Sequence, residues 1–290
     1  MIDLIPYANI FPENFQKIIP ALGPWISSLN TNKLALFFQN LFAFIEIFHI
    51  LGLFMLGGAV IMISLRLIGV GLVELPASQI QRSVRIWMTI GVVLAIVTGL
   101  MIGLSNASKL YNNSAFLFKM IAMIAAIIFS YFVLIPVAKA DGKADGRAKI
   151  GLLLAGLIWI VSLIVLIENK GSNVGIVHIL AASSLISFAA LKGKARWIMT
   201  GGLAIIVGAW QYVTHVTTTL GTTAEQAAAY DKANFWFIVA TAVWLLGAML
   251  LNVTGRIGPK DSNALARLVG YATILVWVTV GVGGRWIGLT

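Results

Sequence analysis

Long apolar segments separated by short polar turns constrain the fold of this chain more than any other feature of its sequence. A helix needs about 20 apolar residues to cross the hydrocarbon core of a bilayer. Of the 290 residues, 60% are hydrophobic and 10% are charged, whereas soluble domains carry about 25% charged residues. We therefore expect an all-α integral membrane protein with eight transmembrane helices, the fifth being the shortest, at 36–65, 84–104, 115–138, 148–168, 174–191, 197–219, 234–253 and 264–288.

The basic residues mark one side of this expected bundle. The turns that follow segments one, three, five and seven, together with the first four residues of the segments after them, contain thirteen of the twenty Lys and Arg residues. Because short cytoplasmic loops are enriched in Lys and Arg, this distribution predicts a multi-pass protein of the bacterial inner (cytoplasmic) membrane with both termini periplasmic. The net charge of +10 is then a topology signal, and we expect no nucleic-acid partner.

Similarity between the two halves predicts two tandem four-helix units, at 33–170 and 171–290. The stretch IFHIL at 47–51 recurs as IVHIL at 176–180, and the start of segment two resembles the start of segment six. An even number of helices in each unit gives both units the same orientation in the membrane. The preceding residues 1–32 contain four prolines and several aromatic residues. We expect them to form an interfacial arm, because aromatic side chains gather at the membrane surface.

Three histidines lie within the apolar segments, all in the half nearer the predicted periplasmic side. His178 and His215 are each about four residues, or about 6 Å, from that end of two consecutive segments. Paired side chains at matched depth on neighbouring helices are suitable axial ligands for haem. We predict that His178 and His215 hold a b-type haem and that His49 belongs to a second site. The absence of cysteine excludes thiolate ligands, iron–sulfur clusters and thiol catalysis.

Four further residues are expected to support a cofactor. Glu46 lies three residues before His49 on the same helix face, and Tyr212 has the same spacing from the histidine of segment six. Lys119 and Arg285 lie near the predicted periplasmic ends of segments three and eight, where they can pair with haem propionates. Two plainer interpretations stay open: His49 can simply be hydrogen-bonded to Glu46 or a backbone carbonyl, and the two cations can extend to the membrane surface.

Methionines offer a copper alternative. The first unit has no histidine at the position equivalent to His215, but Met101 lies one turn away, and Met120 and Met123 lie at a similar depth. Imidazole and thioether groups both bind Cu(I), and a His–Met pair also ligates haem. These methionines, with His49, therefore form the candidate copper site. Ordinary packing of flexible side chains is the alternative explanation.

Four short motifs resemble those of a group of poorly characterised bacterial polytopic membrane proteins. The motifs are Glu46–Gly52 (ExxHxxG), Leu65–Gly69 (LRLIG), Phe116–Met120 (FxxKM) and Gly284–Gly288 (GRWIG). Those proteins are similar in pattern to copper-resistance D (CopD)-like proteins and to small four-helix cytochrome b-like proteins. The resemblance implies a membrane bundle with a haem or copper site at the level of the outer histidines, and it implies no particular substrate.

Together these patterns predict a membrane-embedded b-type haem protein that transfers electrons near the periplasmic face. Its expected partners are the lipid bilayer, a quinone or a periplasmic redox protein, and the other subunits of a larger redox complex. Copper transport or handling is one alternative, and a cofactor-free structural subunit is another. The sequence has no nucleophile elbow and no phosphate loop, which favours an accessory subunit over a stand-alone enzyme.

Overall fold

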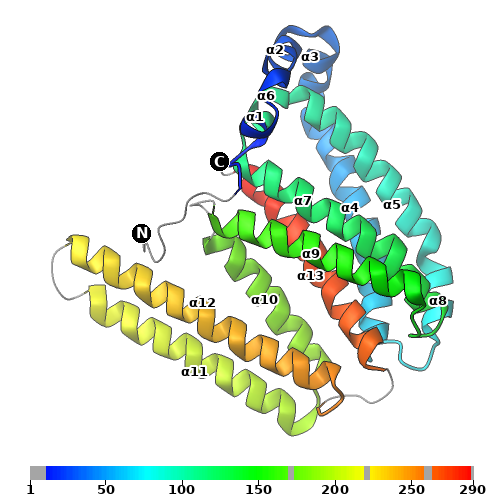
Figure 1. Cartoon of the computed structure of the whole chain (residues 1–290), viewed down its shortest axis with the longest axis vertical. Helices are drawn as coiled ribbons and strands as arrows, with labels where there is room; N and C mark the ends of the chain where they lie inside the picture. The colour runs from blue at the N-terminus through cyan, green and yellow to red at the C-terminus, as the bar shows by residue number, and fades with distance from the viewer. Residues whose placement is uncertain (1–10, 169–172, 219–222, 258–262, 289–290) are drawn as a thin grey trace.

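Every regular element in the described part of the chain is helical, in a computed structural model that describes residues 11–168, 173–218, 223–257 and 263–288 (Figure 1). The α-helices are α1 (Phe15–Ile18), α2 (Gly23–Ser28), α3 (Lys33–Asn40), α4 (Phe42–Ile68), α5 (Ala77–Ser105), α6 (Ala107–Tyr111), α7 (Ser114–Ile128), α8 (Ile135–Lys139), α9 (Gly146–Glu168), α10 (Asn173–Ala190), α11 (Gly193–Thr218), α12 (Thr223–Val253) and α13 (Ala264–Ile287). The 3-10 helices η1 (Pro20–Leu22) and η2 (Leu29–Thr31) and the π-helix η3 (Phe129–Leu134) complete the fold.

Seven helical spans within the described residues are long and apolar enough to cross a membrane. They are α4, α5, the continuous run α7–η3–α8, α9, α11, α12 and α13. This confirms a multi-pass helical membrane protein. The fifth expected segment corresponds to α10, whose apolar part, Ile176–Ala190, is shorter than the other spans. The expected eighth crossing is therefore not confirmed, and the predicted location of both termini on one side depends on that crossing.

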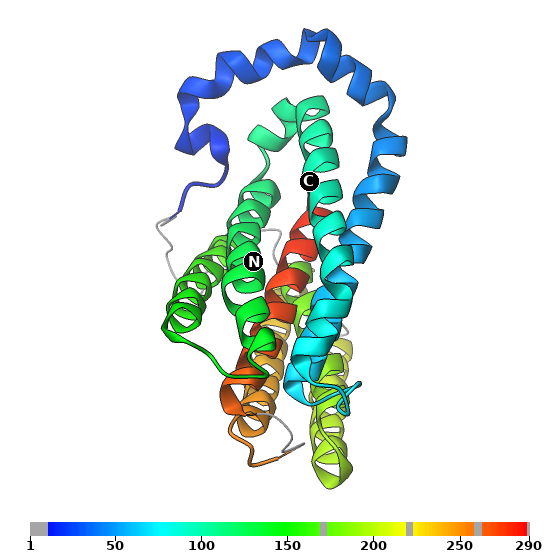
Figure 2. The ribbon, with the colours of Figure 1, turned by 90° about the vertical axis from the view of Figure 1, so that its right-hand side faces the viewer.

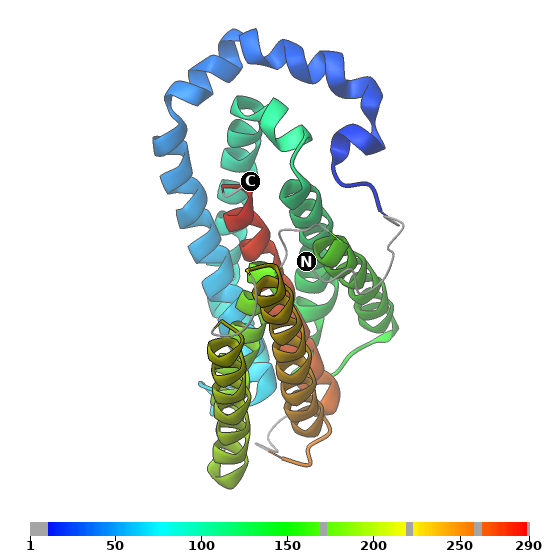
Figure 3. The same ribbon diagram turned by 90° about the vertical axis from the view of Figure 1, so that its left-hand side faces the viewer.

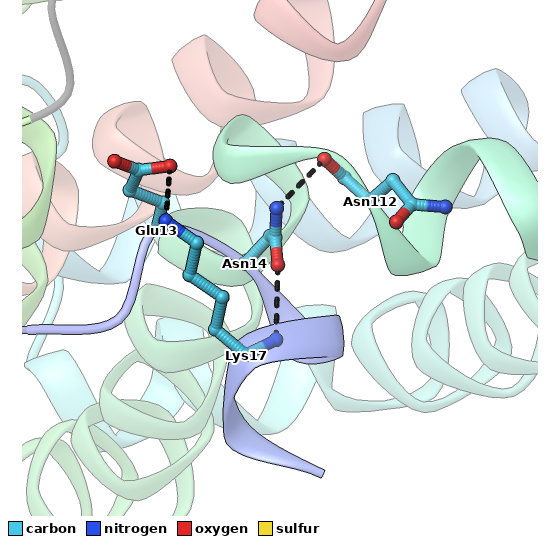
Figure 4. A network of polar contacts seen from close by, with 4 residues as sticks. All are labelled: Glu13, Asn14, Lys17 and Asn112. Carbon is cyan, nitrogen blue, oxygen red and sulfur yellow. Dashed lines mark hydrogen bonds and ion pairs between the residues drawn. The ribbon is translucent and has the colours of Figure 1, made fainter. Parts of the chain in front are cut away.

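The N-terminal arm arches over one end of the bundle, which we call the arm end (Figure 2). Helices α1 and α2 and the turns η1 and η2 contain no buried residue, as expected for a segment at an interface. Polar contacts hold the arm to α6 and the residue after it. The Tyr111 hydroxyl donates to the Ile19 carbonyl at 2.6 Å, and the Asn14 side chain donates to the Asn112 carbonyl at 3.2 Å (Figure 4).

The last helix, α13, packs in the middle of the first half of the chain. It contacts α4 and α7 more extensively than it contacts α12, and it is seen between α4 and α7 in Figure 3. Gly270 makes this possible at α4, because a Cβ there would lie 2.6 Å from the Ser64 carbonyl oxygen. A bundle that includes α13 does not divide at residue 170, so the two predicted tandem units are not confirmed.

Small residues also bring α4 and α5 together. A Cβ on Gly91 would lie 2.6 Å from the Leu56 amide nitrogen, and one on Gly52 would lie 3.0 Å from the Gly91 carbonyl oxygen. Without a hydrophobic driving force between helices in lipid, such close approach of backbones is the main source of helix association. The α4–α5 pair is the most extensive helix contact in the fold, and it holds the His49 region of α4 in place.

The run α7–η3–α8 changes its helical geometry just before Pro136. Proline lacks an amide hydrogen and clashes with the preceding turn, and the six residues of η3 widen into a π-helix there. The Trp277 indole of α13 donates to the Ser130 hydroxyl of η3 at 2.9 Å. The Trp159 indole of α9 donates to the Thr279 hydroxyl of α13 at 3.0 Å. These two bonds fix α13 between α9 and η3.

The remaining helices extend away from this core. Helices α11 and α12 lie side by side (Figures 1 and 3), where the Trp244 indole of α12 covers Gly202 of α11 and donates to the Met199 carbonyl at 2.9 Å. Helix α10 packs mainly against α12 and α13, and only slightly against α11. Helix α12 is therefore the main neighbour of α11.

Candidate functional site

Two adjoining cavities lie at the arm end of the bundle. The first, of about 690 Å³, lies between α4, α13 and the arm-end parts of α5, α6 and α7. The second, of about 460 Å³, lies between α5 and α7 under the arm, and we call it the slot. The wall that the two cavities share consists of His49, Leu53, Leu56, Gly99, Leu110, Phe116, Lys119, Trp277 and Val280. The two titratable groups in this wall are the imidazole of His49 and the amine of Lys119.

A hydrogen-bonded chain orients His49. Its Nδ1 lies 2.9 Å from the Thr98 hydroxyl oxygen, and that hydroxyl donates its single proton to the Leu94 carbonyl at 2.6 Å. The hydroxyl oxygen must then accept from Nδ1–H, because it has no second proton to donate. When the ring is neutral, this arrangement leaves the lone pair on Nε2. Gly99 makes room for the ring, since a Cβ there would lie 3.3 Å from its Cε1.

Lys119 lies on α7 against the glycines of α13. A Cβ on Gly283 would lie 2.8 Å from the Lys119 Cβ, and one on Gly284 would lie 3.7 Å from the Lys119 Nζ. The amine is close enough to His49 for the two groups to interact electrostatically. Among the described residues, Lys119 forms no hydrogen bond and no ion pair. It is thus a partly buried cation with no counter-charge paired to it in the part of the chain that the structure describes.

Three exposed charged residues stand at the mouth of the first cavity. Glu46 comes from α4, Lys109 from α6 and Arg285 from α13, and all three line that cavity. Their side chains form no ion pair or hydrogen bond within the described ranges. The expected pairing of Glu46 with His49 or Lys119 is therefore not seen, and Thr98 occupies the position beside His49 instead.

The predicted methionine ligands divide into two groups. Met120 and Met123 line the slot together with His49, as the copper alternative requires. Met101, on α5, lines neither cavity. The described residues contain no group of three or more His, Cys, Asp or Glu side chains that would hold a metal ion.

The two histidines predicted to share a haem lie elsewhere. His178 on α10 and His215 on α11 are both exposed, and α10 and α11 pack less against each other than each packs against α12. Tyr212, their predicted supporting residue, is 70% exposed. A haem between His178 and His215 stays a prediction. The structure instead brings Glu46, His49, Lys119 and Arg285 together around one cavity.

Thr98, Gly99 and Lys109 complete the site, and the sequence did not single them out. Thr98 is a polar residue within an apolar stretch of α5, but many such residues only bond to their own helix, as Thr89 does to the Arg85 carbonyl. Thr98 can be recognised as the partner of His49 only when the register between α4 and α5 is known.

Comparison with known proteins matches about half of the chain to one protein family. No curated protein and no solved structure matches the chain, so the resemblance to CopD-like and cytochrome b-like proteins stays untested. Residues 35–176 match DUF6644, a protein family of unknown function. The matched range includes α4, α5 and α7, which carry Glu46, His49 and Lys119, and it stops before α13, which closes the first cavity.

Proposed function

We propose that the protein holds a b-type haem in the first cavity, with His49 as an axial ligand, and transfers electrons near the periplasmic face of the inner membrane. The observation that carries the proposal is the chain from His49 through Thr98 to Leu94. Ligating histidines almost always donate their second ring N–H to an oxygen acceptor, which fixes the tautomer and orients the ring. His49 has this arrangement, and its Nε2 is available to a metal.

Glycines in the first cavity support the insertion of a flat macrocycle. A glycine that allows close helix packing has a neighbouring helix where its Cβ would be, as Gly52 and Gly91 do. Gly57 and Gly281, which line the first cavity from α4 and α13, have nothing within 4 Å of the position of an added Cβ. Close helix packing does not explain them. They keep a space open on either side of the cavity, which a planar ring system would use.

The charges around the cavity also suit haem. Its two propionates need cations, and Lys109, Lys119 and Arg285 all line the first cavity. Lys109 and Arg285 are exposed at the mouth, where propionates would reach the polar interface of the membrane. Electrostatic pairing with the cofactor would therefore neutralise charges that have no partner among the described residues.

Copper binding is the second candidate, supported by the slot. His49, Met120 and Met123 line it together, and imidazole with thioether ligands suits Cu(I). Metal analysis separates the two proposals. The copper proposal predicts bound copper that is lost when Met120 or Met123 is replaced, whereas the haem proposal predicts iron and does not need these methionines. A structural subunit without a cofactor is the remaining alternative, and it predicts neither metal.

Titration of the purified apoprotein with haemin, followed by the Soret absorbance, tests the proposed site. We expect one saturable site that is lost in His49→Ala and kept in the double variant His178→Ala/His215→Ala. The double variant is the control for the general loss of imidazole groups. Haem binding that survives His49→Ala but is lost in the double variant would overturn the site and favour the pair on α10 and α11.

A further inference from the structure

The slot has the dimensions of a long hydrocarbon chain. It is lined along α5 from Val92 to Leu104 and along α7 and η3 from Phe116 to Tyr131. At 1.5 Å per helical residue, these stretches are about 18 Å and about 22 Å long. Helix α5 packs on α3 and α4, whereas α7 packs on α9 and α13. The slot therefore lies between two helices that pack mainly on different neighbours, and α5 meets the run α7–η3–α8 at α8.

The slot has one charged group near the arm end and is mostly apolar along the rest of its length. Lys119 is the one Lys, Arg, Asp or Glu residue among those that line it, and most of the other lining residues are apolar. Lys119 lies near the arm end of α7, whereas Tyr131 lies at the far end of the slot. A cation within a membrane span is costly unless it is paired, and the described residues offer Lys119 no counter-ion. One negative charge and one long apolar chain would complement this arrangement.

We propose that the slot binds a long-chain carboxylate, with its head group at Lys119 and its hydrocarbon chain extending along α5 and α7 toward Tyr131. The arm covers the end of the slot near Lys119, because the arm residues Phe15, Leu22 and Trp25 line the slot there. This site does not depend on the haem proposal. The first cavity has two other cations at its mouth, Lys109 and Arg285, and neither of these lines the slot.

Quenching of tryptophan fluorescence by brominated palmitate, with the full chain in nanodiscs of a zwitterionic lipid, tests the proposal. Trp25 and Trp277 line the slot, so a bound brominated chain would quench them. The methyl ester of the same acid partitions into the bilayer without the negative charge and measures non-specific quenching. We expect saturable quenching by the acid and only linear quenching by the ester. Octanoate, whose chain is too short to fill the slot, should compete weakly.

Two variants identify the site, and both need a check of folding by gel filtration and thermal unfolding. Lys119→Met should weaken palmitate binding by about tenfold or more, because a charge-assisted contact is lost, while Lys109→Met should bind normally. Gly103→Phe should block the slot, since a Cβ at Gly103 has open space around it. Equal quenching by acid and ester, full displacement by a neutral quinone, or unchanged binding by Lys119→Met would each overturn the proposal.

Discussion

The Thr98 hydroxyl accepts the Nδ1–H of His49 at 2.9 Å and donates to the Leu94 carbonyl at 2.6 Å. This relationship joins α4 to α5 at the level of both cavities. It also decides which nitrogen of His49 can bind a metal. Because Thr98 is only 6% exposed, water cannot readily replace it, and its hydroxyl helps to orient the imidazole together with the Ala95 backbone.

Thr98→Val should weaken haem binding without removing it. Valine keeps the shape of threonine but leaves Nδ1–H without its acceptor, and loss of such an outer partner typically costs about 10–100-fold in metal affinity. Haemin titration measures the change. Thr89→Val is the matched control, because Thr89 makes the same bond to its own helix, to the Arg85 carbonyl, on an exposed face of α5. Equal affinities for Thr98→Val and the unmodified protein would contradict the role assigned to Thr98.

Gly91→Ala should destabilise the fold. The new Cβ would lie 2.6 Å from the Leu56 amide nitrogen and 2.7 Å from the Gly52 carbonyl oxygen, so α4 and α5 would have to separate. Overpacking of this kind costs about 1–3 kcal/mol, which a fall in the midpoint of thermal unfolding in detergent would report. Gly156→Ala on α9, where a Cβ meets nothing within 4 Å, should unfold at the normal temperature. The same midpoint in both variants would show that the α4–α5 contact is looser than described.

Tyr111→Phe should loosen the arm. The substitution removes the hydroxyl that donates to the Ile19 carbonyl at 2.6 Å, a bond worth about 1 kcal/mol. Limited proteolysis should then cleave the region of residues 15–31 several-fold faster. Tyr212→Phe removes a hydroxyl from a tyrosine that is 70% exposed, and it should leave the cleavage rate unchanged. An unaltered rate in Tyr111→Phe would show that apolar contacts alone hold the arm.

Arg285→Ala combined with Lys109→Ala should reduce haem affinity while leaving palmitate binding intact. Both cations line the first cavity and neither lines the slot. Parallel titrations with haemin and brominated palmitate measure the two effects in one preparation. Equal losses in both titrations would indicate that the cavities act as a single site, contrary to their separate roles here.

The sequence predicted the membrane-length helices well because hydropathy is a local property. Apolar runs located the seven membrane-length spans. That residues 1–32 form an interfacial arm stays a prediction. The sequence also indicated which residues lie near one another. Glu46 and His49 share a helix face, and the expected depth of Lys119 and Arg285 placed them at the same end, where all four line one cavity. Their role in holding a cofactor stays a prediction.

The pairing of distant helices was not predictable in the same way. The sequence similarity between the halves favoured two separate units, but Gly270 and Gly283 let α13 pack closely on α4 and α7. The same contacts close the first cavity with residues from the end of the chain. The expected neighbourhood of His178 and His215 relied on consecutive helices packing together, whereas α11 packs mainly on α12.

The reduced-minus-oxidised visible spectrum of the protein purified from bacterial membranes, with iron and copper counted on the same sample, tests the central proposal most directly. We expect the bands of a b-type haem with iron near one per chain, and the loss of both in His49→Ala. Bound copper without these bands would contradict haem binding and would support a copper site at His49, Met120 and Met123. A spectrum without haem bands and a sample without either metal would contradict a cofactor at His49.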